Sequence, residues 1–199
     1  NQLLKLVHNI EGDIVEGGVH WGYGILIEVL LSNKHIHAFD SFAGHSKPTK
    51  QDLSSSSWIP LNSSFAVSEN DAYKTLLIGS NLSKKEISRR VSFYKGWIQD
   101  TMPAWSEDML QKGSKIAYVH ADMDIYNPIK TILNTTFPLL NLGGVVCLGM
   151  LNNPELEGKR IAFNEFLESI DKSSIEIKKI DVIDTDGKSS ELVYFVKLS

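Results

Sequence analysis

The residues best suited to chemistry lie between positions 12 and 44, where acids and glycines separate short apolar runs. Glu16 and Gly18 follow the first run, Gly22 precedes the second, and Asp40 ends the third. Glycines let the backbone approach a ligand without a Cβ in the way, and a helix that starts after them offers unpaired N–H groups. Asp40 stands 22 residues after Gly18 and is placed to accept both hydroxyls of a ribose. This spacing predicts the first half of a nucleotide-binding βαβ unit, although an ordinary glycine-containing turn between a strand and a helix has the same parts.

The glycine spacing differs from that of a dinucleotide-binding loop. A G-x-G-x-x-G motif starting at Gly22 would need its third glycine where Ile27 stands. The acid-x-Gly-x-x-x-Gly pattern of Glu16, Gly18 and Gly22 instead resembles the first motif of S-adenosylmethionine-dependent methyltransferases. In that motif the loop holds the methionine end of a cofactor that has no pyrophosphate.

The composition indicates one ordinary globular domain spanning residues 1–199, with 42% hydrophobic residues. A net charge of −4 argues against a nucleic-acid-binding surface. No apolar run approaches the roughly 18 residues of a membrane span. The single cysteine, Cys147, excludes an intrachain disulfide and makes the cytoplasm the simplest compartment.

Periodicity predicts five strands that are each followed by a helix, and then a hairpin. The strands are expected at 14–15, 36–39, 91–94, 115–119 and 145–148, with Gly143-Gly144 as a turn before the last of them. The helices are expected at 25–31, 65–78 with Ser68 as its N-cap, from Thr101 onward, at 127–140 and at 158–170. A short helix within 1–10 is expected to pack at the sheet edge, and residues 43–64 to form a lid or a disordered loop.

The end of the chain changes from helical periodicity to alternation. Residues 175–183 and 191–198 alternate around Asp186-Gly187, which is typical of a hairpin. The whole order predicts an α/β fold with a mostly parallel seven-stranded sheet and a C-terminal antiparallel hairpin. This is the order of class I methyltransferases, whereas a redox dinucleotide domain more often continues to a last parallel strand.

Several segments in the same order resemble the macrocin-type sugar O-methyltransferases of antibiotic biosynthesis. The resemblance covers Gly12 to about Leu167 and is carried by GDIVEGGVHWG, AFDSFAG, FYKGWIQDTMP, KIAYVHADMDIYNP, NLGGVVC and RIAFNEF. GWIQDTMP and DMDIY make it much more specific than a glycine-rich loop alone. It implies transfer of a methyl group from S-adenosylmethionine to a small hydroxylated acceptor, with a sugar expected.

The resemblance also implies which residues contact the cofactor. They are Glu16, Gly17, Gly18 and Gly22 at the methionine end, Asp40 at the ribose hydroxyls, Ser41 and Phe42 beside the adenosine, and Gly96, Trp97 and Ile98 on the adenine side. These segments all follow parallel strands, where open α/β sheets bind ligands. A flat aromatic such as Trp97 suits an adenine wall, and it suits a core position equally well.

A Mg²⁺ site is implied by the same resemblance. Its ligands would be the first acid of the D-x-D segment, which is Asp122, and an Asp-Asp pair after the next strand. That pair is absent: its place falls on Gly149-Met150 without gaps, or near Asn152-Asn153 with a short insertion. Asparagine oxygens bind Mg²⁺, but losing two negative charges weakens the site, because Mg²⁺ favours carboxylate and water oxygens. The candidate ligands are therefore Asp122, Asn152 and Asn153, and the departure puts metal dependence in question.

Without a metal, methyl transfer to a hydroxyl needs a base. Asp122 is the first candidate, because it ends a predicted central strand that faces the site. His120 and then His20 follow, and the alternation of His120 with Asp122 predicts that both share one face. A lone histidine is more often structural.

Two other readings stay open at this point. A methyltransferase-like domain that binds the cofactor without catalysis would explain the missing acid pair. A Rossmann dehydrogenase or epimerase is disfavoured by the absent third glycine and the terminal hairpin. The partner expected is a small-molecule acceptor, with no nucleic acid and no membrane, and a homo-oligomer is left open.

Overall fold

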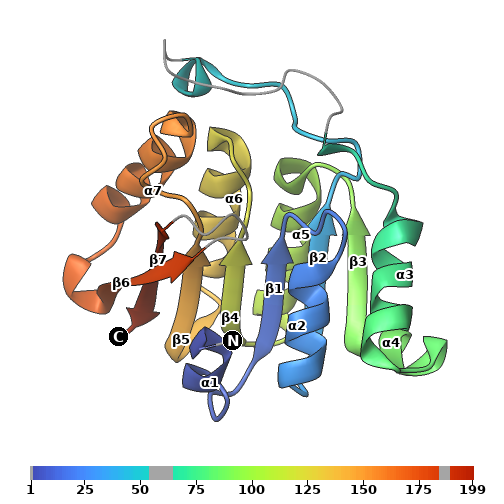
Figure 1. The fold of residues 1–199 in the computed structure, drawn as a ribbon. Coiled ribbons are helices and arrows are strands. Elements are labelled where there is room, and N and C mark those ends of the chain that lie inside the picture. The colour runs from blue at the N-terminus through green and yellow to red at the C-terminus, as the bar shows by residue number, and fades with distance from the viewer. Residues whose placement is uncertain (1, 54–64, 184–188) are drawn as a thin grey trace.

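One seven-stranded sheet forms the centre of the structure, a computed structural model that describes residues 2–53, 65–183 and 189–199 (Figure 1). The strand order is β3-β2-β1-β4-β5-β7-β6. The first five strands of that order are parallel, and β7 is antiparallel to both of its neighbours. The strands are β1 (Asp13–Gly17), β2 (Ile36–Asp40), β3 (Val91–Lys95), β4 (Ile116–Ala121), β5 (Leu140–Leu148), β6 (Ile175–Ile183) and β7 (Ser189–Lys197). The predicted parallel sheet with a terminal hairpin is confirmed, and Asp186-Gly187 lies outside the described residues.

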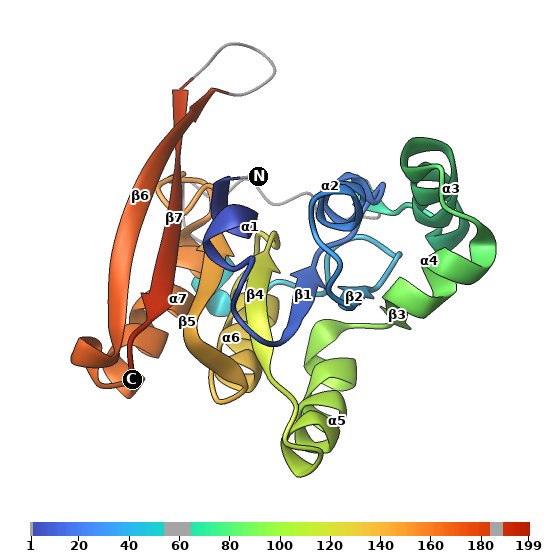
Figure 2. The ribbon, with the colours of Figure 1, turned by 90° about the horizontal axis from the view of Figure 1, so that it is seen from below.

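Helices cover both faces of the sheet, and each face has its own buried core (Figure 2). One face is covered by α1 (Gln2–Leu6), α2 (Tyr23–Leu31), α3 (Glu69–Ser80) and α4 (Lys84–Arg90). The other is covered by α5 (Ile98–Gln111), α6 (Tyr126–Thr136) and α7 (Glu157–Ser169). The described residues also form two 3-10 turns, η1 (Lys50–Asp52) and η3 (Lys172–Ser174). The strands appear in the sequence as continuous apolar runs because both faces of the sheet are buried.

Three local predictions need correction. α5 begins at Ile98, three residues before Thr101, because Trp97 already has an extended conformation and forms the N-cap. Gly143-Gly144 lies inside β5 at an irregularity in its pairing with β4, and is not a turn before the strand. α1 packs its leucines onto the sheet face with Tyr118 and Cys147, not at an edge. The predicted cap of α3 is confirmed, since the Ser68 hydroxyl accepts the Asp71 N–H at 3.2 Å.

The segment after β2 passes above the carboxyl ends of the parallel strands (Figure 1). Its far end is fixed by Asp52, whose buried carboxylate accepts the N–H of Tyr126 at the start of α6 at 2.8 Å. The other oxygen of Asp52 accepts the N–H and the hydroxyl of Thr49. A Cβ at Gly158 in α7 would lie 1.8 Å from this carboxylate, so only glycine fits there. Residues 43–53 are thus tied to two helices, while 54–64, the rest of the expected lid or disordered loop, lie outside the described residues.

Among the described residues, no helix is long and apolar enough to cross a membrane.

Candidate active site

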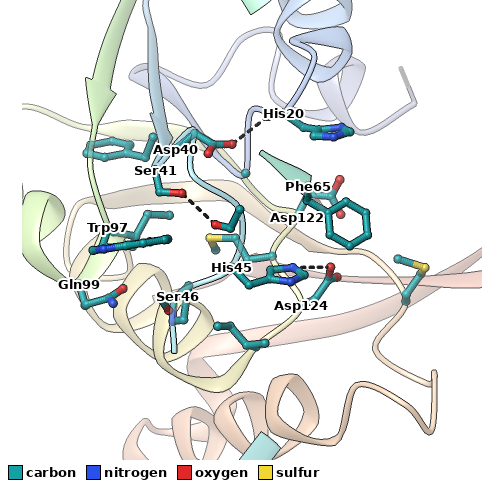
Figure 3. Close-up of a pocket in the computed structure, with 18 residues that line it drawn as sticks. His20, Asp40, Ser41, His45, Ser46, Phe65, Trp97, Gln99, Asp122 and Asp124 are labelled. Carbon is teal, nitrogen blue, oxygen red and sulfur yellow. Dashed lines mark hydrogen bonds and ion pairs between the residues drawn. The ribbon is translucent and has the colours of Figure 1, made fainter. Parts of the chain in front are cut away.

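A cavity of about 270 Å³ opens at the carboxyl ends of the parallel strands, beneath the segment that follows β2. Its walls come from the ends of β1, β2 and β4, the start of α5, and the residue Met150 after β5. Figure 3 shows side chains from these elements converging on one space. Ligands of open α/β sheets bind at this edge, so the cavity is the candidate active site.

The carboxylate of Asp40 is oriented by two backbone donors. The N–H of His20 donates to one oxygen at 2.8 Å (Figure 3), and the N–H of Phe42 donates to the other at 2.7 Å. His20 and Phe42 both adopt positive φ, at 48° and 54°, which is uncommon for residues other than glycine. Each carboxylate oxygen keeps a further lone pair, so Asp40 retains the capacity to accept two ligand hydroxyls.

The neighbours of Asp40 divide between the cavity and the core. Ser41 lines the cavity, and its hydroxyl donates to the carbonyl of Gly44 at 2.9 Å. The Phe42 ring is buried in the core beside Phe93, with ring centroids 6.3 Å apart, so Phe42 serves the site through its N–H.

The glycine turn after β1 brings the backbone close to the strand that carries Asp122. A Cβ at Gly18 would lie 2.3 Å from the carbonyl oxygen of Asp122, and φ there is 90°. Gly18 lines the cavity, Gly17 ends β1, and Gly22 is the N-cap of α2. Of these three glycines, Gly18 is the one that contributes to the wall of the cavity.

The first turn of α5 forms another wall. Trp97 and Ile98 line the cavity, and Gly96 donates its N–H to the carbonyl of Asp40 at 3.0 Å. Trp97 is absent from both buried cores, whereas Trp105 on the same helix belongs to one. Of the two roles predicted for Trp97, this position favours the ligand wall.

Three polar atoms at this cavity are buried and lack a hydrogen-bond partner among the described residues. They are Nδ1 of His45, Oγ of Ser46 and Oε1 of Gln99. Buried polar atoms are nearly always hydrogen-bonded, and an unsatisfied one costs about 1–3 kcal/mol. Sequence reasoning missed all three residues. His45 and Ser46 lie in a segment without periodicity, and Gln99 precedes Thr101, where the sequence predicts that the helix begins.

Asp122 and Asp124 lie on the far side of the cavity from Trp97 (Figure 3). Asp122 is exposed and carries no side-chain hydrogen bond within the described part of the chain. Asp124 Oδ2 lies 3.2 Å from Nε2 of His45. Burial alone would raise the pKa of Asp124, but the hydrogen bond from His45 and the charge of Lys159 outweigh it and lower the pKa.

His120 points away from this cavity. Its Nδ1 lies 2.8 Å from Oε2 of Glu16, which is 2% exposed. Burial alone would lower the pKa of His120, but the charge and hydrogen bond of Glu16 raise it to about 10. Glu28, on α2, is also buried, and its pKa is raised by burial and by the charge of Glu16. His120 is therefore a protonated partner for Glu16, and the raised pKa of Glu28 limits the negative charge beside this pair.

The predicted shared face of His120 and Asp122 is not observed. His120 lines a second cavity of about 420 Å³, under α1, together with Glu28 and Tyr118. Asp122 lies just beyond the end of β4, where strand alternation no longer applies, and it lines the first cavity. His20 lines the first cavity as well.

The residues around Asp122 do not fit a Mg²⁺ ion. A Cβ at Gly149 would lie 3.5 Å from Oδ1 of Asp122, so position 149 faces this acid but supplies no oxygen. Neither candidate asparagine lines the cavity. Asn152 donates its amide to Glu191 on β7, and Asn153 accepts the N–H of Glu155 at 2.9 Å. Mg²⁺ requires several oxygen ligands in near-octahedral geometry, and these positions do not provide them.

Solved structures share this architecture at low sequence identity. CalS11, a calicheamicin methyltransferase, superimposes with a TM-score of 0.76 at 20% identity, covering 98% of this chain and 76% of that one. The O-methyltransferase NovP gives 0.73 at 22% identity, covering 100% of this chain and 77% of that one. TomG from Streptomyces achromogenes, an O-methyltransferase of tomaymycin synthesis in complex with S-adenosylmethionine, gives 0.60 at 16%, with 100% and 77% covered. These likenesses establish the class I methyltransferase fold.

No curated protein matches the chain. The family model of the macrocin O-methyltransferases (TylF) matches residues 4–186, which is nearly the whole length and includes every wall of the first cavity. The chain therefore belongs to the macrocin O-methyltransferase family.

Proposed function

We propose that this chain transfers the methyl group of S-adenosylmethionine to a hydroxyl of a sugar or another small acceptor, with the first cavity holding the cofactor and Asp122 acting as the base. The observation that carries the cofactor site is the set of buried polar atoms that line the same cavity as Asp40 and have no hydrogen-bond partner within the described ranges. The family and the fold support the reaction. The acceptor and the residue roles are our inference.

The cavity walls match the parts of the cofactor in order. Asp40 has free lone pairs for the two ribose hydroxyls. Trp97 offers a flat face for the adenine ring, and the unpaired Oε1 of Gln99 is an acceptor for its exocyclic amino group. The turn at Gly18 lies between these walls and Asp122, which is the direction in which the methionine end with its methyl group would extend.

When bound, S-adenosylmethionine supplies an electrophilic methyl group, and its carbon–sulfur bond breaks as the acceptor oxygen bonds to that carbon. Asp122 takes the hydroxyl proton, since it is exposed at the cavity and belongs to the rim that an acceptor would reach. A positioned base contributes roughly 10²–10⁴-fold to such a step. Holding the two reactants in line contributes further, because it replaces a bimolecular encounter. His120, paired with Glu16 in the other cavity, is left to a structural role.

A sugar acceptor is favoured by the family. The apo structure of CalS11 is described as that of a TDP-rhamnose 3'-O-methyltransferase of calicheamicin biosynthesis, and it superimposes with a TM-score of 0.67 at 19% identity. Met150, which follows β5, supplies an exposed apolar side chain to the rim. Such a side chain suits the carbon face of a sugar ring.

Calorimetric titration with S-adenosylhomocysteine tests the cofactor site. We expect micromolar binding by the wild-type chain, and weaker binding after Gln99→Met. Gln111→Met is the matched control, because Gln111 is exposed at the far end of the same helix. Absence of binding by the wild-type chain would refute the assignment of the cavity.

Mass spectrometry on a panel of nucleotide sugars, phenols and catechols then tests the reaction. We expect a methylated product with one acceptor class, and its loss with Asp122→Asn while cofactor binding persists. Full turnover by Asp122→Asn would remove this residue from the mechanism. Tight cofactor binding without any product would favour the non-catalytic alternative, which the missing acid pair motivates.

A further inference from the structure

A fully buried lysine lies near the two acids of the candidate active site. Lys159, in the first turn of α7, has a side chain with 0% exposure. Its Nζ has no hydrogen-bond partner in the part of the chain that the structure describes. A buried ammonium without compensation is very unfavourable, so a lysine at such a position needs nearby negative charge.

That negative charge comes from Asp122 and Asp124. Burial lowers the pKa of Lys159, and the two groups that oppose this lowering most are Asp122 first and Asp124 second. The same attraction acts on Asp124, where the charge of Lys159 helps to lower the pKa. The charges of both acids therefore act on the buried ammonium of Lys159, which forms no direct hydrogen bond to either carboxylate in the described part of the chain.

Position 149, next to Asp122, lacks an acid. It faces Asp122 at ordinary contact distance, and the ungapped one of the two alignments that the resemblance allows puts the first acid of a metal-binding pair there. This chain has glycine at that position, so an acidic ligand is missing where a cation is already present. A divalent ion placed beside Asp122 would also be repelled by the ammonium, because like charges interact strongly in a partly buried site.

We propose that the buried ammonium of Lys159 is the resident cation of this site, and that its charge stabilises the carboxylates of Asp122 and Asp124 in place of a divalent metal. The part of this proposal that concerns catalysis rests on the proposed function. Lys159 is a positioning residue, because its side chain is fully buried and does not line the cavity, whereas Asp122 is the group exposed to the acceptor.

Binding of Mn²⁺, followed by electron paramagnetic resonance of the free ion, tests whether the ammonium takes the place of a divalent ion. This experiment does not depend on methyl transfer. We expect the wild-type chain to bind Mn²⁺ no better than Asp122→Asn. The double variant Gly149→Asp/Lys159→Met restores an acid and removes the ammonium, and we expect at least roughly tenfold tighter binding than wild type. Gly149→Asp alone and Gly149→Asp/Lys159→Arg should show no such gain, because the positive charge remains.

Two outcomes would overturn the proposal. The first is Mn²⁺ binding by the wild-type chain that is roughly tenfold tighter than that of Asp122→Asn. The second is a double variant that is folded, as judged by urea unfolding, yet gains no binding. Lys112→Met is the surface control, since Lys112 forms only an exposed pair with Asp108, and it should leave Mn²⁺ binding unchanged.

The catalytic part has its own readout. Once an acceptor is known, turnover by the wild-type chain should persist after dialysis against EDTA, and a loss that Mg²⁺ restores would refute metal independence. Lys159→Met should lower kcat with little effect on KM, and Lys159→Arg should recover part of the loss. If no acceptor is methylated at all, the proposed function fails, whereas the Mn²⁺ experiment still decides the role of Lys159.

Discussion

Replacing His120 with glutamine tests the ion pair that it forms with the buried Glu16. His120→Gln leaves Glu16 buried, without its cationic partner and next to Glu28. Removing one member of a buried pair costs about 3–5 kcal/mol, because the remaining charge is uncompensated. The 2.8 Å contact and the 2% exposure of Glu16 place this pair in that class.

The pH dependence of this contribution follows from the direction of the pKa shift. His120 has a pKa of about 10 in the folded chain, against an ordinary value of 6.5. Because the pKa of His120 is higher in the folded chain, its protonation contributes its full stabilisation below pH 6.5. This contribution is lost as the pH rises toward 10. Within that window the loss is about 1.4 kcal/mol per pH unit, or about 5 kcal/mol in total.

Urea unfolding of wild type and His120→Gln at several pH values between 6 and 9 measures both effects. The difference in unfolding free energy should be largest near pH 6 and should shrink steadily as the pH rises. Glu16→Gln/His120→Gln replaces the ion pair with two neutral amides and should recover much of the stability. His8→Gln, at an exposed position, is the control. A difference below about 1 kcal/mol that does not change with pH would refute the reasoning, because an exposed pair contributes that little.

Three further substitutions test the site and its support. Gln99→Met should weaken S-adenosylhomocysteine binding roughly five- to tenfold in calorimetry, since one hydrogen bond contributes about 1 kcal/mol, and unchanged affinity would rule out the adenine contact. Asp52→Ala should lower the unfolding free energy by about 2–4 kcal/mol in urea, because the N–H of Tyr126 and the N–H and hydroxyl of Thr49 lose their acceptor. A loss below about 0.5 kcal/mol, which is the usual effect of a surface substitution, would contradict this. Gly18→Ala should destabilise the chain more than Gly113→Ala, because both glycines have positive φ but only Gly18 lies against a backbone oxygen; equal losses would show that conformation alone matters.

The sheet could be predicted from the sequence because strands buried on both faces appear as apolar runs. Asp40, Gly18 and Trp97 could be placed for a related reason: each directly follows a predicted strand, and parallel strands end at one edge. A residue at the end of a strand is located by the strand itself. This holds even where a helix boundary is wrong by three residues, as at the start of α5.

Other parts of the site could not be predicted from sequence. His45 and Ser46 lie in a segment without periodicity, so no pattern says which of its residues turn inward. Lys159 occupies a helix whose apolar positions are elsewhere, and a lysine is almost never fully buried. His120 meets Glu16 because β4 pairs with β1, and these two strands are far apart in the chain. The charge state of His120 therefore could not be predicted from the sequence.

Gly158 and Lys159 are successive residues, and this has a mechanical consequence. The first accommodates Asp52, which fixes the segment above the cavity, and the second supplies the positive charge behind Asp122 and Asp124. The first turn of α7 therefore sets both the position of the segment above the cavity and the position of the buried positive charge. The two cannot be adjusted separately, and a side chain added at Gly158 would disturb access and electrostatics together.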